Sequence, residues 1–114
     1  MENNADEIIP GVWLGNESAS QDSDFIKKTG IKSIVNCTKH IKCKWLEIDY
    51  YRVPVNDPGP TTDPDQEDNV IMMKHLPHVL MFIRTAQKPI LIHCHAGRIR
   101  SASILLCFLI RDVF

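Results

Sequence analysis

A cysteine and an arginine stand in a segment whose residue types favour phosphate chemistry. Cys94 opens the segment and Arg100 closes it, with five residues, including Gly97, between them. Backbone N–H groups of such a loop can turn inward and bind an anion at the start of a helix. The same positive field favours the cysteine thiolate, which is the nucleophilic form. The guanidinium of Arg100 offers a planar fork of donors that matches two phosphate oxygens. The segment therefore predicts a site for cysteine-dependent hydrolysis of a phosphate ester.

The residues around the cysteine have expected parts in this chemistry. Cys94 would attack phosphorus in line and form a phosphocysteine intermediate that water then hydrolyses. Ser101 would donate a hydrogen bond to the Cys94 sulfur when the thiolate leaves, and His93 would fix the loop through its carbonyls. Backbone N–H groups and the Arg100 side chain would hold the phosphoryl oxygens. The residues of this phosphate cradle are His95, Ala96, Gly97, Arg98, Ile99 and Arg100.

The departing alkoxide or phenoxide needs a proton from a general acid, a contribution of roughly 100- to 10,000-fold in rate. Asp57 is the expected donor because it follows a strand-like run that ends at residues 54–56 and begins an acidic, proline-containing loop. Asp63 and Asp65 lie further along the same loop and are the reserve candidates. The alternative is that these carboxylates only keep a surface loop solvated.

Alternating strands and helices are needed to position this segment. Strands are expected within residues 7–15, where the run is bent at Pro10 and Gly11, and within 31–37, 47–53 and 89–93. Helices are expected over residues 16–29, ended by Gly30, over 67–85, kinked or divided at Pro77, and over 98–112. This order predicts an α/β fold with a mostly parallel sheet of four to five strands, flanked by helices. Ligands of such sheets bind at the carboxyl ends of the strands, where Cys94 is expected.

The whole chain has the composition of one globular domain. It has 114 residues, 44% of them hydrophobic, and a formal net charge of −1, which gives no indication of a nucleic-acid or membrane partner. The acidic N-terminus differs from a targeting peptide, and the apolar run at residues 103–110 is too short to span a bilayer. Residues 1–114 are thus expected to form a single soluble domain, in the cytoplasm or alternatively the nucleus.

Cys94 has two other interpretations. The first is a buried core cysteine, which would not require the neighbouring histidine, glycine, arginine and serine. The second is a metal site formed by residues 93–95, but adjacent strand residues point to opposite faces and no second ligand pair has zinc spacing. The four cysteines show no C-x-x-C pair, and none is expected to form a disulfide. No metal or cofactor is expected.

Residues 93–101, His-Cys-His-Ala-Gly-Arg-Ile-Arg-Ser, resemble the H-C-x-x-G-x-x-R-S signature of the cysteine-dependent protein phosphatases in its dual-specificity form. Residues 9–15 and 34–38 look like the opening and central strands of that family, and residues 53–57 look like the segment that delivers its general acid. The resemblance covers roughly residues 7–110. It implies a protein tyrosine phosphatase-like fold and phosphorylated proteins as substrates, with phosphotyrosine, phosphoserine and phosphothreonine all accepted.

The sequence departs from the family pattern in two places and leaves alternative functions open. Ile99 stands where the family has a small residue, and the chain stops at Phe114, so the C-terminal helices of the family are expected to be absent. A phosphate-binding pseudophosphatase without turnover is therefore the main alternative. His95 and Arg98 would add positive charge, which favours a second alternative, a phosphoinositide or an RNA 5′ phosphate as substrate.

Overall fold

The computed structural model describes residues 4–55, 65–95 and 99–114. In chain order the described residues form β1 (Ala5–Ile9), β2 (Val12–Gly15), α1 (Glu17–Gln21), α2 (Ser23–Thr29), β3 (Ser33–Asn36), β4 (Asp49–Arg52), α3 (Asp65–Thr85), β5 (Ile90–His93), α4 (Ile99–Phe108) and a single π-helical turn, η1 (Leu109–Val113). Among these residues, no helix is both long and apolar enough to cross a bilayer.

The strands of the described residues form one five-stranded sheet in the order β1-β2-β5-β3-β4. The β1–β2 pair is antiparallel, whereas β2–β5, β5–β3 and β3–β4 are parallel. The predicted α/β fold with a mostly parallel sheet is therefore confirmed. Because β5 lies in the middle, the residue that follows it sits at the centre of the edge where the carboxyl ends of the parallel strands meet.

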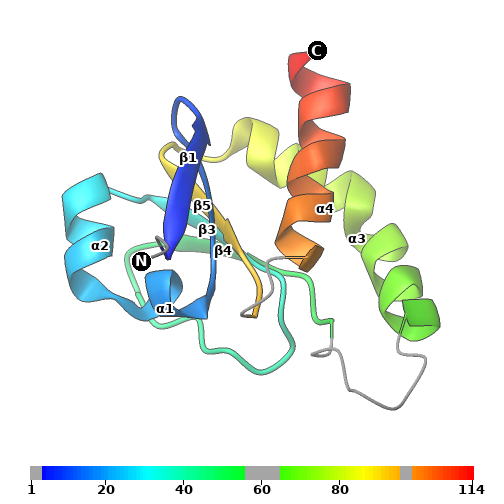
Figure 1. Ribbon diagram of the computed structural model, residues 1–114, viewed down its shortest axis with the longest axis horizontal. Helices are drawn as coiled ribbons and strands as arrows, with labels where there is room; N and C mark the ends of the chain where they lie inside the picture. The colour runs from blue at the N-terminus through cyan, green and yellow to red at the C-terminus, as the bar shows by residue number, and fades with distance from the viewer. Residues whose placement is uncertain (1–3, 56–64, 96–98) are drawn as a thin grey trace.

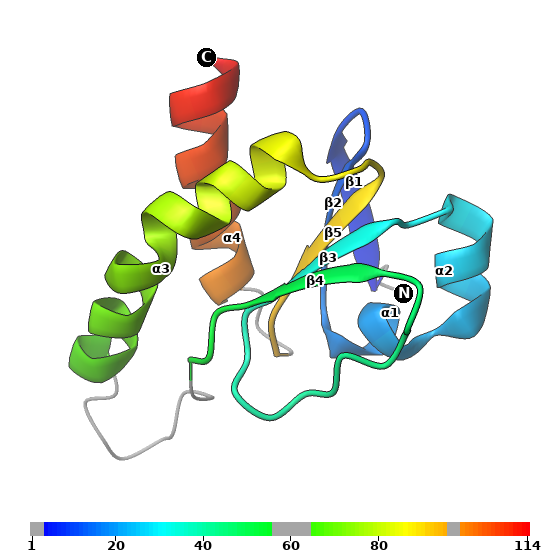
Figure 2. The same ribbon diagram turned by 180° about the vertical axis from the view of Figure 1, so that it is seen from behind.

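Helices cover both faces of the sheet. Figure 2 shows α3 and α4 on one side of the strands and α1 and α2 on the other. Side chains of a strand alternate between the faces, so Ile90 and Ile92 join the cluster under α3 and α4, while Leu91 joins the cluster under α1 and α2. The helical members of the first cluster are Val79, Leu80, Ile83, Ile104, Leu105 and Phe108. The central strand is thus buried on both faces.

The N-terminal third follows the expectation in part. The run over residues 7–15, expected as a bent strand or a turn at Pro10 and Gly11, is a hairpin of β1 and β2, which turns at Gly11 with a φ of 82°. The single helix expected over residues 16–29 is two helices, because the Asp22 side chain accepts hydrogen bonds from the backbone N–H groups of Asp24 and Phe25 and so begins a new helix. Gly30, with a φ of 71°, ends α2 as expected.

The C-terminal helices follow the expectation more closely. Of the two alternatives for the helix that contains Pro77, kinked or divided, division is wrong: α3 continues from Asp65 to Thr85 and changes direction along its length (Figures 1 and 2). Proline removes the hydrogen bond to the carbonyl of Met73, a residue on the exposed side of α3, where water can take the place of the lost donor. The predicted helix over residues 98–112 is α4 followed by η1.

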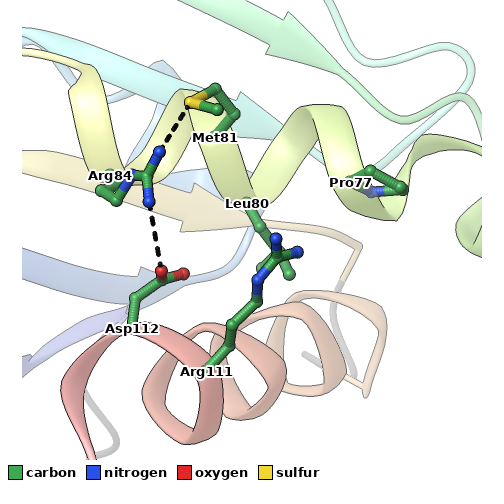
Figure 3. A pocket seen from close by; sticks show the side chains of 6 residues that line it. All are labelled: Pro77, Leu80, Met81, Arg84, Arg111 and Asp112. Carbon is green, nitrogen blue, oxygen red and sulfur yellow. Dashed lines mark hydrogen bonds and ion pairs between the residues drawn. The ribbon is translucent and has the colours of Figure 1, made fainter.

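The far ends of these two helices are tied together by a side-chain contact. The Arg84 guanidinium lies 3.9 Å from a carboxylate oxygen of Asp112, and it also reaches the Met81 sulfur at 3.2 Å. Figure 3 shows both contacts beside a hollow of about 20 Å³ between Pro77, Leu80 and Arg111. The hollow lies beside η1, at the opposite end of α4 from the Cys94 segment, and it contains no nucleophilic side chain.

Candidate active site

Cys94 follows directly on β5 and is nearly buried, with 3% of its surface exposed. Its sulfur lies 3.2 Å from the hydroxyl oxygen of Ser101, in the first turn of α4, and 3.6 Å from the backbone carbonyl oxygen of His95. The strand and the helix therefore bring two residues seven positions apart into contact. The Ser101 side chain is fully buried at this contact, so water does not compete for its hydroxyl.

We expect Ser101→Ala to slow the breakdown of a phosphocysteine intermediate more than its formation. The hydroxyl is the neighbour that can donate a hydrogen bond to the sulfur when it leaves phosphorus as a thiolate. Rapid-quench kinetics with an aryl phosphate should show a burst of one equivalent of phenol, followed by turnover about 10-fold slower than in the wild type. Ser103→Ala, two residues further along α4, is the matched control. Equal loss of burst rate and steady-state rate in Ser101→Ala would contradict the assignment.

His93 is completely buried at the end of β5. Its Nδ1 lies 3.4 Å from the carbonyl oxygen of Cys94, and its Nε2 has no hydrogen-bond partner among the residues that the structure describes. The pKa of His93 is lowered to about 4, mainly by burial; the contact with the Cys94 carbonyl raises it and the nearby Arg52 charge lowers it. His93 is thus a neutral imidazole at physiological pH.

This burial predicts a loss of stability in mild acid. Above the unperturbed pKa of 6.5 His93 is neutral in both states, so its burial carries no protonation cost. As the pH falls from 6.5 towards 4, the unfolded chain binds a proton that the folded chain does not bind. The free energy of unfolding should therefore drop by up to about 3 kcal/mol across this window. Urea unfolding of the wild type and His93→Gln at several pH values checks this, and parallel pH profiles for the two would contradict it.

Several of the sequence-predicted residues lie outside the described part of the chain. These are the expected general acid Asp57, its reserve Asp63, and the cradle residues Ala96, Gly97 and Arg98. For Ile99 and for the second reserve, Asp65, the structure describes the helical backbone, in α4 and α3 respectively, and not the side chain. Their roles stay predictions.

Arg100 lies in the first turn of α4 and is partly buried. It lines a cavity of about 380 Å³ between α3 and α4, together with Met72, Met73, Leu76, Ser103, Ile104 and Cys107. The rest of this lining is largely apolar, so α3 forms a non-polar wall beside the arginine. The start of α4 therefore carries both Ser101, in contact with Cys94, and Arg100, beside a cavity.

His95 contacts a residue that the sequence did not indicate. Its Nε2 lies 3.2 Å from a carboxylate oxygen of Glu17, the first residue of α1, and the two form an ion pair when the imidazole is protonated. Glu17 is 77 positions before Cys94 in the sequence, so no local spacing could reveal its contact with His95. Its position after Asn16, which caps α1 at the end of β2, is the only signal that could place it near the carboxyl edge of the sheet.

A second group missed by the sequence interpretation holds the segment after β3. Arg52, the last residue of β4, donates to the backbone carbonyls of Thr38 and Ile41, at 3.0 and 2.8 Å. Asn36 donates to the same Ile41 carbonyl at 2.8 Å and accepts from the Thr38 hydroxyl at 2.6 Å. Asn36 and Thr38 are both buried, which shields these bonds from water. The network fixes the shape of the chain beside Cys94.

Cys37 is the neighbour of Cys94 across the sheet. Its backbone N–H donates to the carbonyl of His93 at 2.8 Å, which continues the β3–β5 register. Burial raises the pKa of the Cys37 thiol well above its usual value, and a charge on Cys94 raises it further. Cys37 therefore stays a neutral thiol, while Cys94 is the cysteine placed next to a hydroxyl donor.

A nearly buried cysteine at the carboxyl end of the central parallel strand, in contact with a serine of the following helix, defines a cysteine-dependent phosphatase-type site. The family model described as "Dual specificity phosphatase, catalytic domain" matches residues 12–113. The chain belongs to this family, which confirms the resemblance predicted from residues 93–101.

Individual relatives agree with the family. The chain is 37% identical over 110 residues to dual specificity protein phosphatase Mpk3 of Drosophila melanogaster, a match that covers 90% of this chain and 25% of that protein. It is 28% identical over 111 residues to human dual specificity protein phosphatase 12, a match that covers 92% of this chain and 31% of that protein. The crystal structure of human DUSP28 has the same fold, with a TM-score of 0.77 at 22% identity, over 98% of this chain and 72% of that one. The chain thus spans a quarter to a third of the length of these two curated relatives.

Proposed function

We propose that residues 1–114 form a single catalytic domain that hydrolyses phosphomonoesters of phosphotyrosine, phosphoserine and phosphothreonine in proteins. Cys94 attacks phosphorus, the P–O bond to the substrate breaks, and Asp57 protonates the departing oxygen. Water then attacks the phosphocysteine, inorganic phosphate is released and the thiolate is regenerated. Arg100 and the backbone N–H groups of residues 95–100 hold the phosphoryl oxygens during both steps.

The observation that carries this proposal is the contact between Cys94 and Ser101. A core cysteine has no need of a hydroxyl donor at its sulfur, whereas a thiolate leaving group does. The contact is held by the end of β5 and the start of α4, which are fixed by the core on both faces of the sheet. Membership in the dual specificity phosphatase family supports the same chemistry.

Steady-state hydrolysis of a small aryl phosphate by the purified chain tests the activity. Phosphopeptides carrying phosphotyrosine, phosphoserine or phosphothreonine then test the dual specificity. We expect turnover of all three without added metal. Turnover of phosphotyrosine alone would restrict the substrate range, while a folded chain that binds these peptides without hydrolysing them would establish the pseudophosphatase alternative and overturn the enzymatic proposal.

A reducing compartment fits this mechanism because the nucleophile must remain a free thiol. All four cysteines of the chain are free in the structure, including the adjacent Cys37 and Cys94. Disulfides form in oxidising compartments and are rare in the cytosol and nucleus. We therefore propose that the domain acts on phosphorylated proteins in the cytoplasm or the nucleus.

A further inference from the structure

Beside the catalytic cysteine lies a cavity whose lining residues, apart from His95, have no part in the proposed chemistry. We propose that this cavity binds an anionic side chain of the substrate peptide next to the phosphorylated residue, with Lys39 supplying the positive charge. The inference rests on the proposed function, since it assigns a specificity site to the same substrate. Hereafter the cavity is called the flanking site.

The position of the flanking site follows from the register of the sheet. Its lining residues are Thr38, Lys39, His40, Ile41, Val55 and His95. They come from the segments that leave the carboxyl ends of three neighbouring parallel strands, β3, β4 and β5. Asn36 pairs with His93, so Thr38 lies two positions beyond that pair, as His95 does. The flanking site therefore begins at the residue that follows the nucleophile.

The charge of the lining favours an anion. Residues 25–46 contain six lysines and no aspartate or glutamate, in a chain whose net charge is −1. The lysines nearest the site in sequence are Lys39, Lys42 and Lys44, and within residues 4–55, 65–95 and 99–114 no acidic residue lines it. Glu17 offsets the charge of His95 when that imidazole is protonated, since the two lie 3.2 Å apart. The attraction for an anion is therefore assigned to Lys39, the lysine of the lining.

The shape of the flanking site is formed in advance. Thr38 and Val55 are buried and form its floor, whereas Lys39 and His40 are exposed at its rim. Arg52 and Asn36 fix the carbonyls of Thr38 and Ile41 on either side of the two basic residues, as described above. A segment held in this way loses little conformational freedom when a ligand binds.

The size of the flanking site suits one small anionic group. The cavity measures about 150 Å³. This volume admits a carboxylate or a phosphate group. Both a glutamate and a second phosphorylated residue could supply the group.

Three phosphotyrosine peptides of the same length test the inference. One has neutral neighbours, one has glutamates beside the phosphotyrosine, and one has a second phosphorylated residue there. We expect higher kcat/KM for the anionic peptides, and we expect Lys39→Glu to lower the ratio of anionic to neutral kcat/KM by about 5- to 10-fold. Lys42→Glu is the matched control because it makes the same charge change on the same segment outside the lining. It should lower the ratio by less than about 2-fold.

The outcomes separate this inference from the proposed function. Absence of turnover with every peptide and with an aryl phosphate would overturn the enzymatic proposal, and the flanking site would then be judged by binding of the same peptides to Cys94→Ser. Equal kcat/KM for the three peptides, or equal losses in Lys39→Glu and Lys42→Glu, would overturn the flanking site. A phosphoinositide headgroup or an RNA 5′ phosphate hydrolysed faster than all the peptides would overturn the assignment to a peptide. Preference for the glutamate or for the phosphate peptide identifies the source of the anion.

Discussion

Replacing Cys94 by serine should abolish phosphate-ester hydrolysis and leave the fold intact. A serine hydroxyl is not ionised at neutral pH and has no general base placed to activate it among the described residues, so it cannot take over as nucleophile. The loss should be at least about 10,000-fold in kcat, the size seen when a nucleophile is removed from an enzyme. Steady-state assays with an aryl phosphate measure this loss, and circular dichroism checks that Cys94→Ser is folded.

Cys107→Ser is the matched control for this prediction. Cys107 is a half-buried thiol towards the far end of α4, thirteen residues beyond Cys94. The same substitution there should leave kcat within about 3-fold of the wild type, since it changes only packing. Activity that persists in Cys94→Ser, or that is lost to the same degree in Cys107→Ser, would show that Cys94 is not the nucleophile.

Truncating Leu91 to alanine should lower the free energy of unfolding by about 2–5 kcal/mol, which is a large part of the about 5–15 kcal/mol typical of a domain. Leu91 is completely buried in the central strand. It pairs with Ile34 of β3 and Trp13 of β2, so two neighbouring strands would face the resulting cavity. Urea unfolding should show a lower midpoint with an unchanged slope.

Leu46→Ala makes the same chemical change at a position with 99% of its surface exposed. It should change the free energy of unfolding by less than about 0.5 kcal/mol. A similar loss in both variants would mean that Leu91 is less well packed than the structure indicates. Because Cys94 follows directly on β5, the comparison measures how strongly the core supports the segment that bears Cys94.

The strands and the site-bearing helix were predictable because their signals are local. Residues 89–93 form a short apolar run before a glycine-containing loop, and β5 forms there. The break at Asp22 was not predicted, since the apolar residues on both sides suit one continuous helix. The break is revealed only by the hydrogen bonds that the Asp22 carboxylate accepts from the backbone N–H groups of Asp24 and Phe25. The sequence also does not predict whether a helix continues through Pro77. That depends on how α3 packs against the rest of the protein.

In the candidate site, too, contacts within one segment could be predicted from the sequence, whereas contacts between distant segments could not. The approach of Ser101 to Cys94 follows from a strand–loop–helix segment of eight residues, so sequence spacing could indicate it. The contact of Glu17 with His95 and the bonds of Arg52 to the segment after β3 join residues far apart in the chain. These contacts depend on strand order and on capping geometry, which periodicity does not reveal. The flanking site could therefore not be predicted from the sequence, because its lining residues come together only when β3, β4 and β5 lie side by side.

The placement of the two tryptophans has a consequence for spectroscopy. Trp13 packs edge-on against Phe25 of α2, and the Trp45 indole donates to the Ser20 carbonyl at 2.9 Å beneath the Lys44 ammonium. Both belong to the layer of α1 and α2, and the layer of α3 and α4 has no tryptophan. Intrinsic fluorescence thus reports on one side of the molecule only, while far-ultraviolet dichroism is dominated by the long helices of the other. Coincident melting curves from the two signals would show that the layers unfold as one unit, and curves that separate would reveal which side loosens first.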